Sequence, residues 1–215
     1  MSSYDELPLF RVEIKECERK NQVSYGILLS CLSTKRNLMV RARESWSYIV
    51  FLRGVYHLYS VKSMVSAMTV SEYWKVLRCI QDMEYLRSEM RRTTNSSPKN
   101  YLVKYSHQRL EDAKKIIRTC SVPEKSKLDY SYCRGQLKKD EEPIDCAYRE
   151  FNEETGIDLR EIPHTLSSEQ ITKTYNTATN LPYTTTLYKV TVESEFDLPS
   201  PSNHEVEKIK WKLEL

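Results

Sequence analysis

The chain contains no long hydrophobic run, and this absence excludes a helical membrane protein. No stretch of its 215 residues approaches the roughly 20 consecutive apolar positions that a membrane-spanning helix needs. The first ten residues also lack the basic start and apolar core of a secretory signal. Hydrophobic residues make up 40% of the sequence and charged residues 29%, which suits one domain with a core and a polar surface. We therefore expect a soluble, cytoplasmic protein.

Paired cysteine spacings are absent as well. The chain has six cysteines, and none of them forms the Cys-x-x-Cys spacing of a zinc site. Reduced thiols are the usual state in a protein without a secretion signal. We therefore expect no zinc and no framework of disulfides.

Charge is unevenly distributed, although the net charge is only +3. Residues 57–128 contain 14 Lys and Arg against 7 Asp and Glu, a balance of +7, so the remainder carries −4. Positive charge that is concentrated in one segment favours a polyanionic partner. A set of solvated helix faces is the alternative interpretation.

Apolar patterns predict strands on both sides of this basic segment. Residues 11–16 alternate like an edge strand, and residues 23–33 and 38–43 predict a hairpin around a polar turn. Residues 45–56 are aromatic and β-branched, and we place them in this first β-rich part. Later strands are predicted at residues 171–175, 184–193 and 206–213.

Helices are predicted within the basic segment. Residues 71–92 contain no Gly or Pro and have apolar side chains at helical spacing, and Thr69 with Glu72 forms a capping box before them. A second helix is predicted at residues 101–120. We therefore predict a basic helical insert, residues 57–128, between two parts of one domain, residues 1–56 and 129–215.

One motif carries the chemistry of the chain. Residues 135–157 read GQLKKDEEPIDCAYREFNEETGI, which fits the pattern G-x5-E-x7-R-E-φ-x-E-E-x-G-φ, with φ apolar. Nine constraints at fixed spacing distinguish this segment from an ordinary acidic amphipathic helix. The matching residues are Gly135, Glu141, Arg149, Glu150, Phe151, Glu153, Glu154, Gly156 and Ile157.

Local physics predicts a helix with two faces in this motif. Pro143 suits the first helical position and Gly156 suits the end of the helix. One apolar stripe consists of Ile144, Ala147, Tyr148 and Phe151. On the neighbouring stripe, Glu150, Glu153 and Glu154 repel one another unless water or a cation neutralises them. Such hard oxygen ligands suit Mg²⁺ or Mn²⁺.

The motif resembles the Nudix box, the signature of a family of metal-dependent pyrophosphohydrolases. The resemblance implies an α/β (α+β) sandwich, with a mixed sheet between helices, and hydrolysis of a nucleoside diphosphate linked to another group. It also implies that Glu150, Glu153 and Glu154 bind Mg²⁺ or Mn²⁺, that Glu141 assists in the same shell, and that Arg149 orients the carboxylates.

The segments around the motif resemble the mRNA-decapping Nudix proteins of large cytoplasmic DNA viruses, of the poxvirus and African swine fever virus type. The similar segments are residues 24–29, 40–43 and 45–56, and a basic helical module follows them. Near the C-terminus, Asn203-His204-Glu205-Val206 is similar to an N-x-E-φ pattern in those proteins, which makes Glu205 a candidate metal ligand or general base. The resemblance also implies a viral protein in the host cytoplasm.

An RNA substrate would need basic and aromatic side chains. Arg134 keeps a cation near the phosphates, where relatives have a proline-containing turn, while Cys133 is predicted to be a half-buried strand residue. Trp46, Tyr132 and Tyr175 are candidates for stacking on a cap. Candidate phosphate contacts in the insert are Lys75, Arg78, Arg87, Arg91, Arg92, Lys104, Arg109, Lys114, Lys115 and Arg118.

Three hypotheses follow. The first is an mRNA-decapping enzyme that releases m7GDP and 5′-monophosphate RNA. The second is a phosphohydrolase of diphosphoinositol polyphosphates or dinucleoside polyphosphates, whose polyanionic substrates the basic insert suits equally well. The third is a catalytically inactive RNA-binding protein, against which the complete set of glutamates argues.

Overall fold

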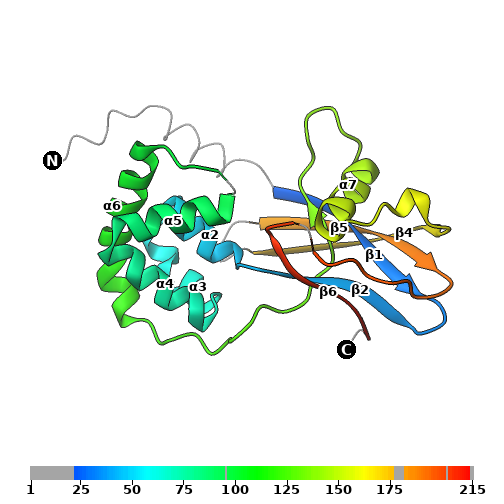
Figure 1. The fold of residues 1–215 in the computed structure, drawn as a ribbon, viewed down its shortest axis with the longest axis horizontal. Coiled ribbons are helices and arrows are strands. Elements are labelled where there is room, and N and C mark those ends of the chain that lie inside the picture. The colour runs from blue at the N-terminus through cyan, green and yellow to red at the C-terminus, as the bar shows by residue number, and fades with distance from the viewer. Residues whose placement is uncertain (1–21, 95, 177–181, 202, 214–215) are drawn as a thin grey trace.

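The structure is a computed structural model, and it describes residues 22–94, 96–176, 182–201 and 203–213. Its centre is one mixed sheet in which the strands follow the order β4-β5-β1-β2-β6, while β3 pairs with β1 (Figure 1). The predicted strand at residues 11–16 lies outside the described residues. The strands are β1 (Gln22–Cys31), β2 (Arg36–Ala42), β3 (Arg134–Gly135), β4 (Thr165–Asn176), β5 (Pro182–Val192) and β6 (Val206–Leu213).

The strand predictions are largely confirmed. β1 and β2 form the predicted antiparallel hairpin, and β6 covers residues 206–213 as predicted. β4 is far longer than the predicted residues 171–175. Most of its side chains are exposed, so an apolar pattern could not reveal it, and antiparallel pairing with β5 holds its backbone instead.

β1 is the central strand of the site-bearing half of the molecule. It runs parallel to β5, in register from Val23 beside Thr184 to Cys31 beside Val192. Its alternate side chains, such as Ile27, are fully buried under α7 (Pro143–Thr155). β1, β3, β5 and β6 all contact this helix, which therefore covers one face of the sheet (Figure 1).

Gly26 lets the chain enter the site next to β1. β3 lies opposite the first half of β1, with Arg134 facing Gly26 and Gly135 facing Tyr25. A Cβ at Gly26 would overlap the carbonyl oxygen of Cys133 and crowd the Arg134 side chain. Only glycine therefore allows the segment before α7 to pack this closely on β1.

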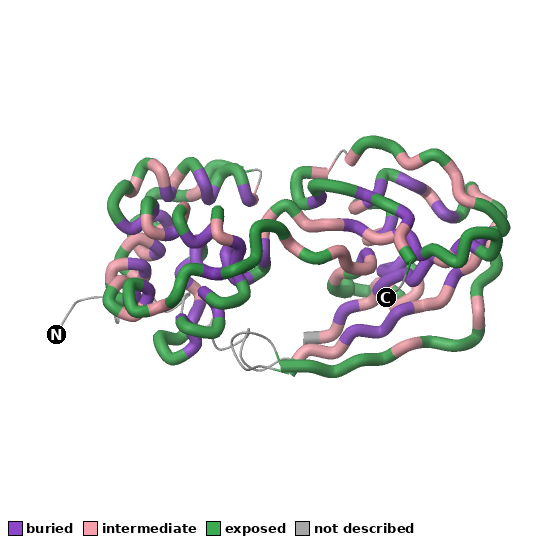
Figure 2. Tube along the Cα trace, turned by 90° about the horizontal axis from the view of Figure 1, so that it is seen from below, coloured by how far each residue is buried: buried purple, intermediate pink, exposed green. Residues whose placement is uncertain are grey.

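The remaining helices form a second cluster with its own hydrophobic core. Figure 2 shows buried positions gathered separately within this cluster and within the sheet. The core of the helical cluster includes the buried side chains of Tyr48, Met64, Leu86 and Leu110. The helices are α2 (Trp46–Arg53), α3 (Val61–Ser66), α4 (Val70–Gln81), α5 (Met83–Thr94) and α6 (Asn100–Thr119).

The helical cluster begins earlier than predicted. Residues 46–53, which we placed in the β-rich part, form α2 and pack in the core of the cluster through Tyr48 and Phe51. Ser45 begins the helix by accepting a hydrogen bond from the Tyr48 amide, and it also donates to the buried Glu72 at 2.9 Å. The core of the helical cluster therefore includes residues that precede position 57, where we predicted the helical insert to begin.

The single helix predicted at residues 71–92 is wrong, because the chain forms α4 and α5 there. The predicted capping box of Thr69 and Glu72 is confirmed at the start of α4. Asp82 lies between the two helices in an extended conformation, and its carboxylate accepts a hydrogen bond from the Tyr85 amide at 2.9 Å. An Asp that caps a new helix ends the previous one without Gly or Pro. The helix predicted at residues 101–120 is confirmed as α6.

The mixed α+β architecture is confirmed as an open mixed sheet with helices beside it. Within the described ranges, we find no helix that combines the length and apolar character needed to cross a membrane.

Candidate functional site

Both ends of α7 follow the prediction, and they orient the helix on the sheet. Pro143 occupies the first turn, where its missing N–H costs no hydrogen bond. Gly156 adopts the left-handed conformation with φ 73°, and its N–H donates to the Asn152 carbonyl at 2.7 Å. Ala147 and Phe151 are buried on the sheet, so the neighbouring stripe of glutamates lies along the edge of the core.

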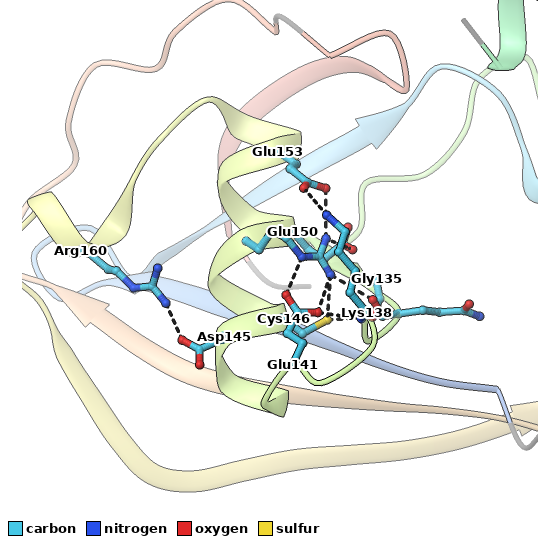
Figure 3. Close-up of polar contacts among 10 residues, drawn as sticks. Gly135, Lys138, Glu141, Asp145, Cys146, Glu150, Glu153 and Arg160 are labelled. Atoms are coloured by element: carbon cyan, nitrogen blue, oxygen red, sulfur yellow. Dashed lines mark hydrogen bonds and ion pairs between the residues drawn. The ribbon is translucent and has the colours of Figure 1, made fainter. Parts of the chain in front are cut away.

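Arg149 contacts three of the motif carboxylates. Figure 3 labels these three residues, Glu141, Glu150 and Glu153. Arg149 Nε and Nη2 donate to the two oxygens of Glu141 at 2.6 and 2.9 Å. Its Nη1 donates to Glu150 at 2.5 Å and to Glu153 at 3.1 Å. The predicted orienting role of Arg149 therefore has a geometric basis, since one planar guanidinium fixes three side chains.

The loop before α7 adds a second cation to this cluster. Lys138 Nζ donates to Glu153 at 3.0 Å, and the Lys138 amide donates to Glu141 at 2.8 Å. The hydrogen bonds from Arg149 are the main reason that the pKa of Glu141 falls to about 2. Sequence reasoning missed Lys138, because only the folded loop brings residue 138 next to residue 153.

Gly135 provides the space that Glu150 occupies. A Cβ at position 135 would overlap the carboxylate of Glu150. The glycine at the start of the motif therefore leaves room for the carboxylate of Glu150 in its present position, and a side chain there would displace it.

We expect Gly135→Ala to reduce activity roughly 100-fold and to destabilise the protein by about 1–3 kcal/mol, because the new methyl group displaces Glu150. Steady-state kinetics and urea unfolding measure the two effects. In a Glu150→Ala background the same change should cost little further stability, since the overlap is gone. Full activity of Gly135→Ala would contradict the assigned position of Glu150.

Glu154 is the most unusual carboxyl group of the cluster. Its Oε2 is buried and has no hydrogen-bond partner among the described residues. Burial is the main cause that raises the pKa of Glu154 to about 8. The charges of Glu150 and Glu205 raise this pKa further, while a hydrogen bond with Cys133 and the charge of Arg134 oppose the rise. Burial likewise raises the pKa of Glu150.

Glu205 reaches the same cluster from the loop before β6. Asn203 Nδ2 donates to the Glu153 carbonyl at 3.0 Å, and Asn203 Oδ1 accepts from the Glu205 amide at 2.7 Å. Asn203 therefore ties this loop to the C-terminal end of α7. The Glu205 side chain is exposed, and its charge contributes to raising the pKa of Glu154. Sequence reasoning gave Asn203 no anchoring role, although the N-x-E pattern contained it.

The donor chemistry of the cluster fits a hard divalent cation. Carboxylate oxygens are the preferred ligands of Mg²⁺ and Mn²⁺, and an unpartnered buried oxygen such as Glu154 Oε2 is suited to coordinate a cation. Among the described residues, no three acidic, His or Cys side chains converge in a ligand arrangement. Arg149 holds Glu150 and Glu153 instead, so cation binding would require both carboxylates to turn from Arg149.

The basic residues of the helical cluster fall into two groups. Several are engaged in contacts within the protein: Arg92 pairs with Glu89 and Glu44, Lys75 lies 3.6 Å from Glu89, and Arg109 donates to the Tyr56 carbonyl. Arg78 lies over the Tyr85 ring, Arg87 pairs with Glu84, and Lys114 pairs with Glu111. The exposed members for which no such pair is found among the described residues are Arg91, Lys104, Lys115 and Arg118.

The structure separates the three candidate aromatic residues. Trp46 is exposed at the start of α2 in the helical cluster, and Tyr132 accepts a hydrogen bond from Asn37. Tyr175 is exposed on β4, where the Arg134 guanidinium lies 5.9 Å from its ring centroid. Cys133, which we predicted as a half-buried strand residue, is instead almost fully buried and lies just before β3, and burial raises the pKa of its thiol.

Two solved structures are similar to the chain, each at 12% identity over 88% of this chain and 78% of the other. One is an Ap4A hydrolase from C. elegans, with a TM-score of 0.43, and the other is the dihydroneopterin triphosphate pyrophosphohydrolase of E. coli, with a TM-score of 0.40. Comparison with curated proteins finds no match. The sequence matches the NUDIX domain family over residues 78–212, well over half of the chain and including the whole of α7. The chain therefore belongs to the Nudix family.

Proposed function

We propose that the protein is a divalent-cation-dependent hydrolase that cuts the 5′ cap of mRNA, releases m7GDP and leaves 5′-monophosphate RNA. Membership in the Nudix family supports a pyrophosphohydrolase. The observation that supports the proposal most is the buried, unpartnered Glu154 Oε2, in a carboxyl group whose pKa the charges of Glu150 and Glu205 help to raise. The resemblance of the flanking segments favours capped RNA, within a host cytoplasm, over other pyrophosphates.

The proposed ligands of Mg²⁺ or Mn²⁺ are Glu150, Glu153 and Glu154, and Glu141 supports them through Arg149. The cation, when bound, neutralises pyrophosphate charge and lowers the pKa of a coordinated water. Lys138 is the nearby side chain that contributes positive charge toward the phosphates. Arg134, which the sequence suggests for the same role, directs its guanidinium to Thr185 and Tyr175. Glu205 is exposed at the edge of the cluster, so it is the carboxylate best placed to accept a proton from an attacking water.

The helical cluster supplies the proposed RNA contacts. Lys104, Lys115 and Arg118 lie on one exposed face of α6, since they are separated by nearly whole helical turns. Such side chains contact phosphates without reading base sequence. Arg92 and Lys75, which we predicted as RNA contacts, are held by Glu89, so we assign them a structural role in the cluster.

A panel of substrates tests the proposal. Cap-labelled RNA, free cap dinucleotide, diadenosine tetraphosphate and an inositol pyrophosphate are each incubated with the protein and Mg²⁺ or Mn²⁺. We expect m7GDP from capped RNA at a far higher rate than product from any other substrate. Preferred cleavage of diadenosine tetraphosphate or the inositol pyrophosphate would replace decapping with the second hypothesis. RNA binding without any hydrolysis would establish the third.

We expect cation affinity to rise with pH up to about 8, because Glu154 must lose its proton to bind a cation and its pKa is about 8. Below that value, apparent affinity should fall about tenfold per pH unit, with one proton released on binding. Without a cation, stability should fall from pH 4.5 to 8, since only the unfolded chain ionises Glu154 in that range. Calorimetric titration with Mn²⁺ and thermal unfolding in chelator measure the two trends.

Glu153→Gln and Glu154→Gln form a matched pair for this prediction. Both variants should bind Mn²⁺ more weakly, but only Glu154→Gln should lose the pH dependence. If Mn²⁺ affinity depended equally on pH in the two variants, the group that loses its proton on cation binding would not be Glu154.

A further inference from the structure

The face of the sheet opposite α7 carries a row of basic side chains outside the site. Within the described part of the chain, no helix covers this face (Figure 1). Lys208, Lys210 and Lys212 alternate along β6 with Ile209 and Trp211, which are buried in the core under α7. Side chains alternate across a strand, so the three lysines project from the uncovered face at intervals of about 7 Å.

Tyr130 lies against this lysine row. Its ring centroid is 4.6 Å from Lys212 Nζ and 5.3 Å from Arg41 Cζ. Arg41 is neutralised by Glu207 at 2.8 Å. No acidic group of the described residues forms an ion pair with Lys208 or Lys210. The lysines therefore leave this part of the face positively charged.

Arg134 extends the charged face toward β4. Cys133 belongs to the core under α7, so Arg134, its neighbour, projects from the opposite face. Arg134 Nη1 donates to Thr185 at 3.4 Å, and its guanidinium lies 5.9 Å from the Tyr175 ring. The rings of Tyr175 and Tyr183 lie 5.5 Å apart and are inclined by 33°. We call this surface the basic tyrosine face, and we define it by Tyr130, Arg134, Tyr175, Lys208, Lys210 and Lys212.

We propose that the basic tyrosine face binds the single-stranded RNA that follows the cap, with the lysines along its phosphates and the tyrosines against its bases. The face combines the two elements that single-stranded nucleic acid needs, a line of positive charge and aromatic rings on one side of a sheet. A duplex hides its bases, so it would gain nothing from the tyrosines. The inference rests on the proposed decapping function, which brings an RNA strand to this site.

Two points of the chain connect the face with the carboxylate cluster. Lys208 follows Glu205 by three residues at the start of β6. At the other side, the charge of Arg134 acts on Glu154, although the Arg134 side chain projects from the basic tyrosine face. RNA that leaves the carboxylate cluster past Lys208 or past Arg134 would therefore reach the basic tyrosine face.

Charge reversal of Lys208→Glu with Lys210→Glu in the full chain tests the inference. Binding of a fluorescent single-stranded RNA, of a duplex and of DNA of the same sequence is measured over a salt series. We expect the Kd for single-stranded RNA to rise at least tenfold, and the slope of log Kd against log salt to fall by about 1.4 for two lost phosphate contacts. Tyr175→Leu should weaken single-stranded binding several-fold and leave duplex binding unchanged. Unfolding midpoints verify that each variant folds.

Lys35→Glu with Arg36→Glu is the matched control, since both residues are exposed and lie outside the face and outside the helical cluster. The control changes net charge equally and should bind RNA within a factor of two of the parent chain. Equal weakening by both double variants, or weakening of duplex and single strand alike, would overturn the inference. A parent chain that binds RNA through this face but hydrolyses no capped RNA would instead refute the decapping function alone.

Discussion

Replacing Glu153 and Glu154 together by Gln is expected to lower kcat by roughly 10³-fold or more, because it removes two of the proposed anionic ligands. The two residues have different surroundings. Glu153 is about half exposed and pairs with Arg149 and Lys138, while Glu154 has its buried, unpartnered Oε2. Rate measurements on capped RNA at saturating Mg²⁺ and Mn²⁺ quantify the loss.

The stability of the double variant separates a chemical role from a structural one. Glutamine has nearly the shape of a protonated glutamic acid, the form that Glu154 adopts below pH 8. We therefore expect the cation-free unfolding midpoint to remain within a few degrees of the parent value at pH 7. Asn152→Gln, an exposed change on the same helix, is the control for activity. Full activity of Glu153→Gln with Glu154→Gln would refute the assignment of these two ligands.

The sequence predicts α7 well because its signals are local. Pro143 and Gly156 act through their own backbone, and the apolar and acidic stripes depend only on helical spacing. The same reasoning finds the capping box of α4. It fails for α2, where aromatic and β-branched residues favour a strand, because the cap at Ser45 and burial in the helical core outweigh that preference.

The contacts that organise the site are long-range, and spacing cannot reveal them. Lys138 reaches Glu153 only because the loop folds back on α7, and Asn203 reaches the Glu153 carbonyl from the far end of the chain. Composition also cannot distinguish a basic side chain available to RNA from one engaged within the fold. Arg92 and Arg91 are neighbours in sequence, yet among the described residues the buried Glu89 holds Arg92 and not Arg91.

The second large effect is expected at Arg149, whose replacement by Met should destabilise the cation-free protein by about 2–4 kcal/mol. Arg149 is largely buried and contacts Glu141, Glu150 and Glu153, so the variant leaves three carboxylates without their common partner. The estimate extends below the range for fully buried ion pairs, since Glu153 is partly solvated. Chemical unfolding in the presence of chelator measures the loss.

Two further measurements distinguish this electrostatic role from lost packing. Arg149 lowers the pKa of Glu141 to about 2. In the parent chain, the stability that Glu141 contributes is therefore present above pH 4.5 and is lost as pH falls toward 2. This loss of stability at low pH should be absent in Arg149→Met. Mn²⁺ should restore much of the stability of the variant, because the cation replaces the missing positive charge. Arg149→Lys keeps the charge without the planar fork, so it should be intermediate in stability. A variant whose stability Mn²⁺ does not raise would show that packing of Arg149, and not neutralisation of the carboxylates, holds the cluster together.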